Sequence, residues 1–160
     1  MTIAIYPGSF DPITNGHIDI LKSGSEIFEK VIIAVSYNIN KKSFLTVEER
    51  VDLIKKSVSH LPNVEVDAFE GLTVEYAKKK NADVLLRGLR TSFDFEYELQ
   101  LSQTNNALNN DLKTIFLITK PEYNFISSSM VREILANDGD ISKFVPKIVE
   151  ERLTAKHRDI

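Results

Sequence analysis

The sequence contains no cysteine, and this absence excludes several kinds of chemistry. Without a cysteine side chain there is no disulfide framework, no zinc–thiolate site and no thiol nucleophile. Long hydrophobic runs are also missing, because stretches such as Val31–Val35 are far too short to span a bilayer. The first residues carry no basic leader, so we expect neither a signal peptide nor association with a membrane. The lack of cysteine fits a reducing compartment, and we expect a cytoplasmic protein.

The excess of one sign of charge over the other is also small. The 20 basic and 23 acidic residues leave a net charge of −3. Because the chain has no broad basic footprint, a nucleic-acid-binding role is the weakest of the functions considered. An anionic ligand would have to be held by local charges instead of the overall field. Neither a Gly-x-Gly-x-x-Gly fingerprint nor a Walker A lysine is present, which disfavours hydride transfer and P-loop hydrolysis.

The hydrophobic pattern predicts alternating strands and helices. The expected strands are 3–6, 31–36, 64–69, 84–86 and 114–118; the expected helices are about 18–28, 47–58, 73–80, 95–108, 128–136 and 146–156. Most strand runs are continuously hydrophobic, as in a sheet covered on both faces, whereas 64–69 alternates and suggests an edge. Thr46 with Glu49 predicts a capping box. We therefore expect an α/β fold in a single domain spanning 1–160, with a five-stranded parallel sheet, helices on both faces and C-terminal helices.

The segment 6–17 leaves the first expected strand and enters the first helix, where such folds bind ligands. Gly8 permits close backbone approach, and Ser9 adds a hydroxyl beside exposed N–H groups. Gly16 and His17 place an imidazole in the first helical turn, where it can donate hydrogen bonds to phosphate oxygens. The alternative is a plain Pro/Gly connection with Asn15 as the helix cap and a solvated histidine.

Residues 14–17, Thr-Asn-Gly-His, resemble the His-x-Gly-His hallmark of the nucleotidylyltransferase superfamily, in the form with threonine first that bacterial phosphopantetheine adenylyltransferases use. The segments 87–90, 94–98 and 125–129 are similar to that family in order and spacing, over essentially the whole chain. The resemblance implies a Rossmann-like fold and transfer of the adenylyl group of ATP, with Mg²⁺, to 4′-phosphopantetheine in coenzyme A biosynthesis. The products would be dephospho-coenzyme A and pyrophosphate. A homohexamer and feedback binding of coenzyme A are implied as well.

The same resemblance assigns roles to individual residues. It implies that His17 and Lys41 stabilise the transition state. The implied acceptor-binding residues are Ser9, Lys41, Thr73 and Arg87. The implied ATP-binding residues are Ser9, Phe10, His17, Gly88, Leu89, Arg90, Glu98, Tyr123, Asn124, Phe125, Ile126, Ser127, Ser128 and Ser129. The chain departs from the family at Thr73, where Leu or Met is usual, and at 91–93, where Phe93 is bulkier than expected.

Each assignment has a structural alternative. Lys41 and Lys42 could be a solvated basic pair on a loop. The two arginines, Arg87 and Arg90, could form ion pairs with acidic residues of 94–98 instead of holding phosphate. The serines of 127–129 could serve only as a helix cap. Among alternative functions, a related nucleotidylyltransferase using CTP or nicotinate mononucleotide stays open, as does a nucleotide sensor without chemistry. Asp11 is the nearest carboxylate that could assist Mg²⁺ indirectly.

Overall fold

A computed structural model of the chain describes residues 2–159, and its centre is one sheet of five parallel strands. The strands are β1 (Ile3–Gly8), β2 (Lys30–Tyr37), β3 (Val64–Glu70), β4 (Val84–Leu89) and β5 (Lys113–Ile118). Their order across the sheet is β3-β2-β1-β4-β5. The chain builds outward from β1 in one direction and then returns to build in the other, so the topological switch point lies between β1 and β4. The expected strands and the edge position of β3 are confirmed.

The helices lie on both faces of this sheet. They are α1 (Asn15–Ile27), α2 (Val47–Ser57), α3 (Thr73–Lys79), α4 (Ser92–Leu108), α5 (Ser128–Ala136) and α6 (Lys147–Arg158), with a short 3₁₀ turn at Pro121–Tyr123. The 3₁₀ turn was not predicted. Pro146 is the N-cap of α6 and lies just before the helix instead of in its first turn. The capping box of Thr46 and Glu49 is confirmed, with both reciprocal hydrogen bonds present.

Side chains of successive strand residues enter two different hydrophobic clusters. In β2, Ile33 points into a cluster with α1, α2, α5 and α6, whereas its neighbour Ile32 points into a cluster with α3. In β4, Leu86 and Leu85 divide in the same way. Because both faces are covered, the residues in the middle of each central strand are apolar on both sides, as in Val31–Val35 of β2 and Val84–Leu86 of β4, and this accounts for the continuous hydrophobic runs.

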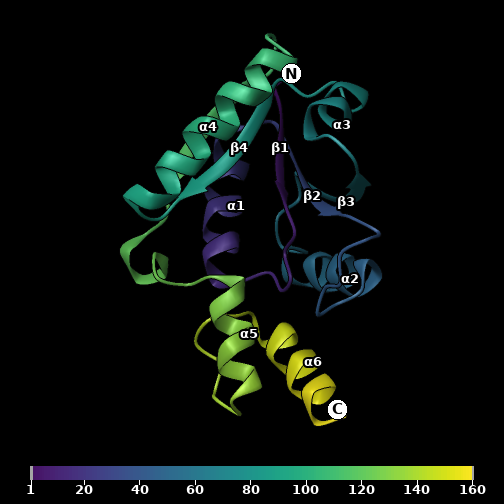
Figure 1. The fold of residues 1–160 in the computed structure, drawn as a ribbon, viewed down its shortest axis with the longest axis vertical. Coiled ribbons are helices and arrows are strands. Elements are labelled where there is room, and N and C mark those ends of the chain that lie inside the picture. The colour runs from purple at the N-terminus through teal and green to yellow at the C-terminus, as the bar shows by residue number, and fades with distance from the viewer. Residues whose placement is uncertain (1, 160) are drawn as a thin grey trace.

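The C-terminal helices support the end of the molecule where β1 and β4 finish. Figure 1 shows α5 and α6 together at the lower end, toward which β4 points. The Ser128 hydroxyl donates to the Pro12 carbonyl at 2.7 Å, and the Asn15 N–H donates to the Phe144 carbonyl at 2.9 Å. The loop between β1 and α1 is thereby held from outside the sheet. Across residues 2–159, no helix combines the length and apolar character needed to cross a membrane.

Candidate active site

Two adjoining cavities open at the carboxyl ends of β1 and β4. The first has a volume of about 250 Å³ and the second of about 360 Å³. They share a wall made by Pro7, Gly8, Ser9, Arg87 and Glu98. This is the switch point of the sheet, where open α/β folds bind their ligands.

The first cavity gathers most of the residues that the sequence assigned to ATP. They are Ser9, Phe10, His17, Gly88, Arg90, Glu98, Ile126, Ser127 and Ser128. They come from the β1–α1 loop, the end of β4, α4 and the start of α5, so segments more than 100 residues apart in the chain, such as Ser9 and Ser127, meet in one cavity. Three of the four residues assigned to the acceptor, namely Ser9, Thr73 and Arg87, line the second cavity. Their contacts with ligands remain predictions.

Several assigned residues line neither cavity. They are Lys41, Leu89, Tyr123, Asn124, Phe125 and Ser129. Lys41 is exposed on the loop that joins β2 to α2, as expected for the structural alternative of a solvated basic pair. Phe125 is 57% exposed, with its ring edge-on to Phe144. None of these residues forms part of the cavity walls, although Leu89, Phe125 and Ser129 are each next in the chain to a lining residue.

The first turn of α1 fixes the tautomer of the His17 ring, and the surroundings of the ring keep it neutral. Thr14, not Asn15, is the N-cap of this helix, and its backbone N–H donates to Nδ1 of His17 at 3.0 Å. Because Nδ1 accepts a hydrogen bond, the proton of the neutral ring lies on Nε2. The ring is half-buried and edge-on to Phe10 at a centroid distance of 5.0 Å. Burial, followed by the positive charges of Arg90 and Arg87, lowers the pKa of His17 to about 3. A neutral N–H donor therefore lines the first cavity.

The lowered pKa predicts that His17 does not titrate near neutral pH. We expect the NMR shift of its Cε1 proton to stay constant from about pH 5 to 8, whereas N-acetylhistidine titrates near 6.5. The unfolded chain takes up this proton as the pH falls below about 6.5, and the folded chain only near pH 3. Protonation therefore favours unfolding as the pH falls through that window. An inflection of the His17 shift near pH 6.5 would contradict this environment.

Two glycines allow the cavity walls to approach closely. A Cβ on Gly88 would lie 2.9 Å from Cγ1 of Ile20, so glycine lets α1 pack directly against β4. A Cβ on Gly8 would lie 3.0 Å from the ring of Phe10. Phe10 itself has a φ of +47°, which turns the chain so that its ring folds back beneath the strand end. Both glycines thus shape the cavity through packing.

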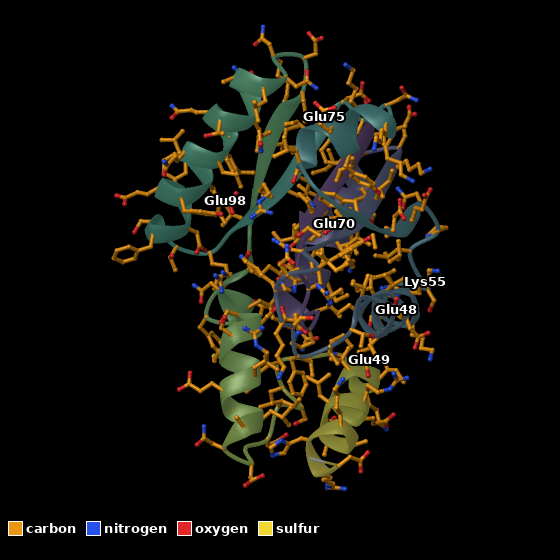
Figure 2. The ribbon with its side chains drawn as sticks, turned by 45° about the vertical axis from the view of Figure 1, so that its right-hand side comes forward. Glu48, Glu49, Lys55, Glu70, Glu75 and Glu98 are labelled. Atoms are coloured by element: carbon orange, nitrogen blue, oxygen red, sulfur yellow. The ribbon has the colours of Figure 1, made fainter. Side chains whose placement is uncertain are left out.

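Arg87 and Arg90 each form the ion pair that the structural alternative anticipated. Arg87 donates to both carboxylate oxygens of Glu98, at 2.8 and 2.6 Å, and to the Pro7 carbonyl at 2.8 Å. Figure 2 shows Glu98 on α4 directed toward the strands. Arg90 donates to Asp94 and, at 2.8 Å, to the Ile126 carbonyl. Both guanidinium groups still line the cavities, so the ion pairs orient them and leave other N–H groups for a ligand.

Comparison with known proteins identifies the family. A model of the cytidylyltransferase-like family matches residues 5–134. The chain is 52% identical over 158 residues to a phosphopantetheine adenylyltransferase of Caldanaerobacter subterraneus, covering 99% of each chain. It is 54% identical over 156 residues to one of Crocosphaera subtropica, covering 98% of this chain and 99% of the relative. This chain belongs to the phosphopantetheine adenylyltransferase family. The resemblance drawn from 14–17 and 87–90 is confirmed.

Solved structures agree on the fold of the family. A putative nicotinate-nucleotide adenylyltransferase from Vibrio parahaemolyticus superposes with a TM-score of 0.74 at 20% identity, covering 100% of this chain and 98% of that one. A lipopolysaccharide core biosynthesis protein from Thermoplasma volcanium has a TM-score of 0.56 at 21% identity, covering 75% and 98%. These likenesses confirm the Rossmann-like α/β fold.

The family departure at 91–93 leaves the loop intact. Thr91 caps α4, and the Asp94 N–H donates to its hydroxyl at 3.4 Å. The helix begins at Ser92, earlier than the expected start at Phe95, because Thr91 caps it there. Phe93 is 84% exposed, so its ring lies on the surface. Arg90 still lines the first cavity.

Of the residues of α4 in the phosphopantetheine adenylyltransferase site, the sequence predicted only Glu98. The same face of the helix also lines the second cavity with Tyr97, Leu101, Ser102 and Asn105, which were not predicted. Glu98, Ser102 and Asn105 recur three or four residues apart, which places them on one side of a helix. That spacing was a visible signal for a mixed polar and apolar wall. Ser36 and Thr114 complete the wall from β2 and β5.

Proposed function

We propose that this chain transfers the adenylyl group of ATP to 4′-phosphopantetheine, producing dephospho-coenzyme A and pyrophosphate in coenzyme A biosynthesis. The two relatives named above support it, because both are phosphopantetheine adenylyltransferases and their sequences are about half identical to this one over nearly the full length. The observation that carries it is the shared wall of the two cavities. One cavity holds His17 and Arg90, and the other holds Thr73 and the α4 face, so a nucleotide and an elongated acceptor could meet at Ser9 and Arg87.

The reaction needs no general base. The acceptor phosphate is already ionised at neutral pH, so its oxygen can attack the α-phosphorus of ATP in line while pyrophosphate leaves. The proton on Nε2 of His17 is then available as a hydrogen-bond donor to the phosphate oxygens, because the pKa is lowered to about 3 and the ring is neutral. Catalysis consists of positioning and stabilisation of the charge that develops.

The start of α5 supplies further donors for the triphosphate. The Ser127 hydroxyl accepts from the Met130 N–H at 3.1 Å, and the Ser128 hydroxyl donates to Pro12, so both hydroxyls have structural partners. The cap expected for these serines is therefore present. The first N–H groups of a helix lack intrahelical partners and can donate to phosphate, which lets capping and binding coexist. Arg90 is held beside this turn by its bond to Ile126.

Mg²⁺ fits this site as a companion of ATP. Across residues 2–159, no group of three or more His, Asp or Glu side chains could hold a metal ion by itself. Mg²⁺ keeps several waters and commonly binds substrate phosphates with few protein ligands, so the ion would enter on the triphosphate. When bound, it would neutralise charge on the leaving pyrophosphate.

Pyrophosphate release tests the proposal. The protein is incubated with Mg²⁺, one nucleotide (ATP or CTP) and one acceptor (4′-phosphopantetheine or nicotinate mononucleotide). We expect release only with ATP and 4′-phosphopantetheine together. Release with a different pair would favour a related nucleotidylyltransferase. ATP binding measured by calorimetry, without release from any acceptor, would favour a nucleotide sensor.

Coenzyme A is expected to bind this protein as a feedback inhibitor. Feedback binding of coenzyme A is proposed for the same two cavities, because this compound contains both the adenylate and the pantetheine arm. Added coenzyme A is then expected to inhibit pyrophosphate release and to compete with 4′-phosphopantetheine. Inhibition that excess acceptor does not relieve would place its site elsewhere. The cytoplasmic location remains a prediction.

The proposed homohexamer is supported by an exposed apolar surface on α4 and β5. Its large side chains are Phe93, Phe95, Tyr97, Leu99, Leu108, Ile115 and Ile118. Within α4 only Glu98 is buried, which is unusual for a helix of 17 residues. Large apolar side chains exposed in this number on two neighbouring elements are typical of protein–protein contact.

We expect light scattering to give about six times the chain mass of 18.2 kDa. Ile118 is 83% exposed on the edge strand β5, and Ile118→Asp should lower the measured mass by placing a charge in the contact. Ile27→Asp, at a side chain 60% exposed on α1, is the matched control and should leave the mass unchanged. A native chain that stays monomeric at micromolar concentration would contradict the assembly.

A further inference from the structure

The loop that carries Lys41 is fixed at both ends while its middle is exposed. At its start, the Lys41 N–H donates to the Asn38 carbonyl at 2.9 Å, and the Ile39 N–H donates to the Glu70 carboxylate at 3.3 Å. Glu70, labelled in Figure 2, is exposed at the end of the edge strand β3. Residues 40–43, in the middle of the loop, are exposed. The reach of the Lys41 side chain therefore depends on what holds the second end.

Asp11 holds the second end from the β1–α1 loop. The Phe44 N–H donates to Oδ2 of Asp11 at 2.8 Å, and the Leu45 N–H donates to Oδ1 at 2.8 Å. The side chain of Asp11 is only 6% exposed, and that of Leu45 only 1%. Hydrogen bonds from backbone amides to a buried carboxylate are among the stronger ones in proteins. Both carboxylate oxygens serve this loop, which gives Asp11 a visible role other than assisting Mg²⁺.

Asp11 is also joined to the walls of the first cavity. Its carbonyl accepts from Arg132 of α5 at 2.6 Å, and Arg132 lies in the helix whose first residues line that cavity. The preceding residue, Phe10, packs edge-on against His17. One residue thus connects the loop of Lys41, the wall beside His17 and the start of α5.

We propose that Asp11 is a positioning residue for adenylyl transfer, which holds the loop 38–46 so that Lys41 can reach the reacting phosphate beside His17. This inference rests on the proposed function. An exposed lysine on a loop free at one end would sample many positions, and ordering it would cost conformational entropy at each turnover. With the loop held, that cost is already met in folding, and a small displacement of the charged group is enough to lower the rate.

The hydrogen bonds from Phe44 and Leu45 to Asp11 can be tested on the native protein without an activity assay. In amide hydrogen exchange measured by NMR, the Phe44 and Leu45 amides should exchange at least about tenfold more slowly than those of Lys42 and Ser43. The latter two make no protein hydrogen bond through their backbone N–H within residues 2–159. Equal exchange rates at all four amides would overturn the proposal, whatever reaction the protein catalyses.

The kinetic role is tested with Asp11→Asn, which keeps the shape but turns an amide NH₂ toward one backbone N–H. We expect kcat to fall about 10–100-fold, while the Kd of ATP from calorimetry changes less than about threefold. Asp83→Asn is the matched control, since Asp83 accepts the Ile3 N–H at 2.9 Å at the opposite end of the sheet. It should retain native kcat. A normal kcat for Asp11→Asn, or an equal loss in both variants, would overturn the role.

A double-mutant cycle shows whether Asp11 acts through Lys41. In a Lys41→Ala background, Asp11→Asn should lower kcat less than about threefold, because the group it positions is gone. The same loss in both backgrounds would overturn the proposal. If Asp11→Asn fails to fold, Asn38→Ala replaces it, because its side chain accepts the Asn40 N–H at the other end of the loop. A native kcat for that variant would then overturn the proposal.

Failure of the proposed function and failure of the positioning role of Asp11 give different results. If the native protein releases no pyrophosphate with any acceptor, the proposed function fails. Hydrogen exchange still decides whether Asp11 holds the Phe44 and Leu45 amides. If the native protein is active and Asp11→Asn is equally active, only the positioning role fails.

Discussion

Replacing His17 with alanine should lower kcat for pyrophosphate release about 10²–10³-fold, the usual loss when one donor to a developing negative charge is removed. The ring is neutral because its pKa is lowered to about 3, so the loss is that of an N–H donor and not of a positive charge. Steady-state kinetics with ATP and 4′-phosphopantetheine measure the effect. Turnover within about threefold of the native value would remove His17 from the mechanism.

A second substitution separates catalysis from helix stability. His17 occupies the third position of α1 and accepts the Thr14 N–H, which is the place that Glu or Gln takes in an ordinary capping box. His17→Gln can keep this hydrogen bond through its carbonyl oxygen and offer its NH₂ to the cavity. We expect it to melt closer to the native protein than His17→Ala does, and to recover part of the lost kcat. A Gln variant as inactive as the Ala variant would show that the ring itself is required.

Lys41→Ala should be the second damaging change, with kcat/KM for 4′-phosphopantetheine reduced about 10²-fold or more. A lysine ammonium is a compact charge that can contact the acceptor phosphate and neutralise the reacting centre, so we expect both a higher KM and a lower kcat. Lys41 is exposed, so its loss should change the free energy of unfolding by no more than about 0.5 kcal/mol. Steady-state kinetics and thermal melting measure the two effects.

Lys42→Ala is the matched control, because Lys42 is the neighbouring residue on the same loop and is also exposed. It should change kcat/KM less than about threefold. If Lys42→Ala caused the large loss and Lys41→Ala did not, the position taken from the family pattern would be wrong by one residue. If neither variant lost activity, the basic pair would be only a solvated part of the surface.

Much of the architecture follows from local sequence. The continuous apolar runs predict strands buried on both faces, and the alternation in Val64–Glu70 predicts the edge strand β3, because each pattern reflects how many faces of a strand are covered. The capping box at Thr46 is equally local, since its partners lie three residues apart. The position of His17 in the first turn of α1 also follows from adjacent residues.

The pairing of charges could be only partly predicted. Acidic partners for Arg87 and Arg90 were expected in 94–98, and the structure selects Glu98 for the first and Asp94 for the second. The choice depends on how α4 lies over β4. Because Glu98 faces the strands, Arg87 can use two donors on it at once, and no pattern in the sequence specifies that geometry.

The sequence alone thus determined the order of strands and helices along the chain and the edge strand β3, because these depend on neighbours in the chain, whereas the site residues were assigned through the resemblance to a known family. Tertiary packing decided what the motif residues experience. The pKa of His17 is lowered by burial and by two arginines more than 60 residues away along the chain, and Asp11 accepts from amides 33 and 34 residues away. Such contacts arise only when segments fold against one another, since a hydrogen bond or a charge acts over a few ångströms of space and not over distance in sequence.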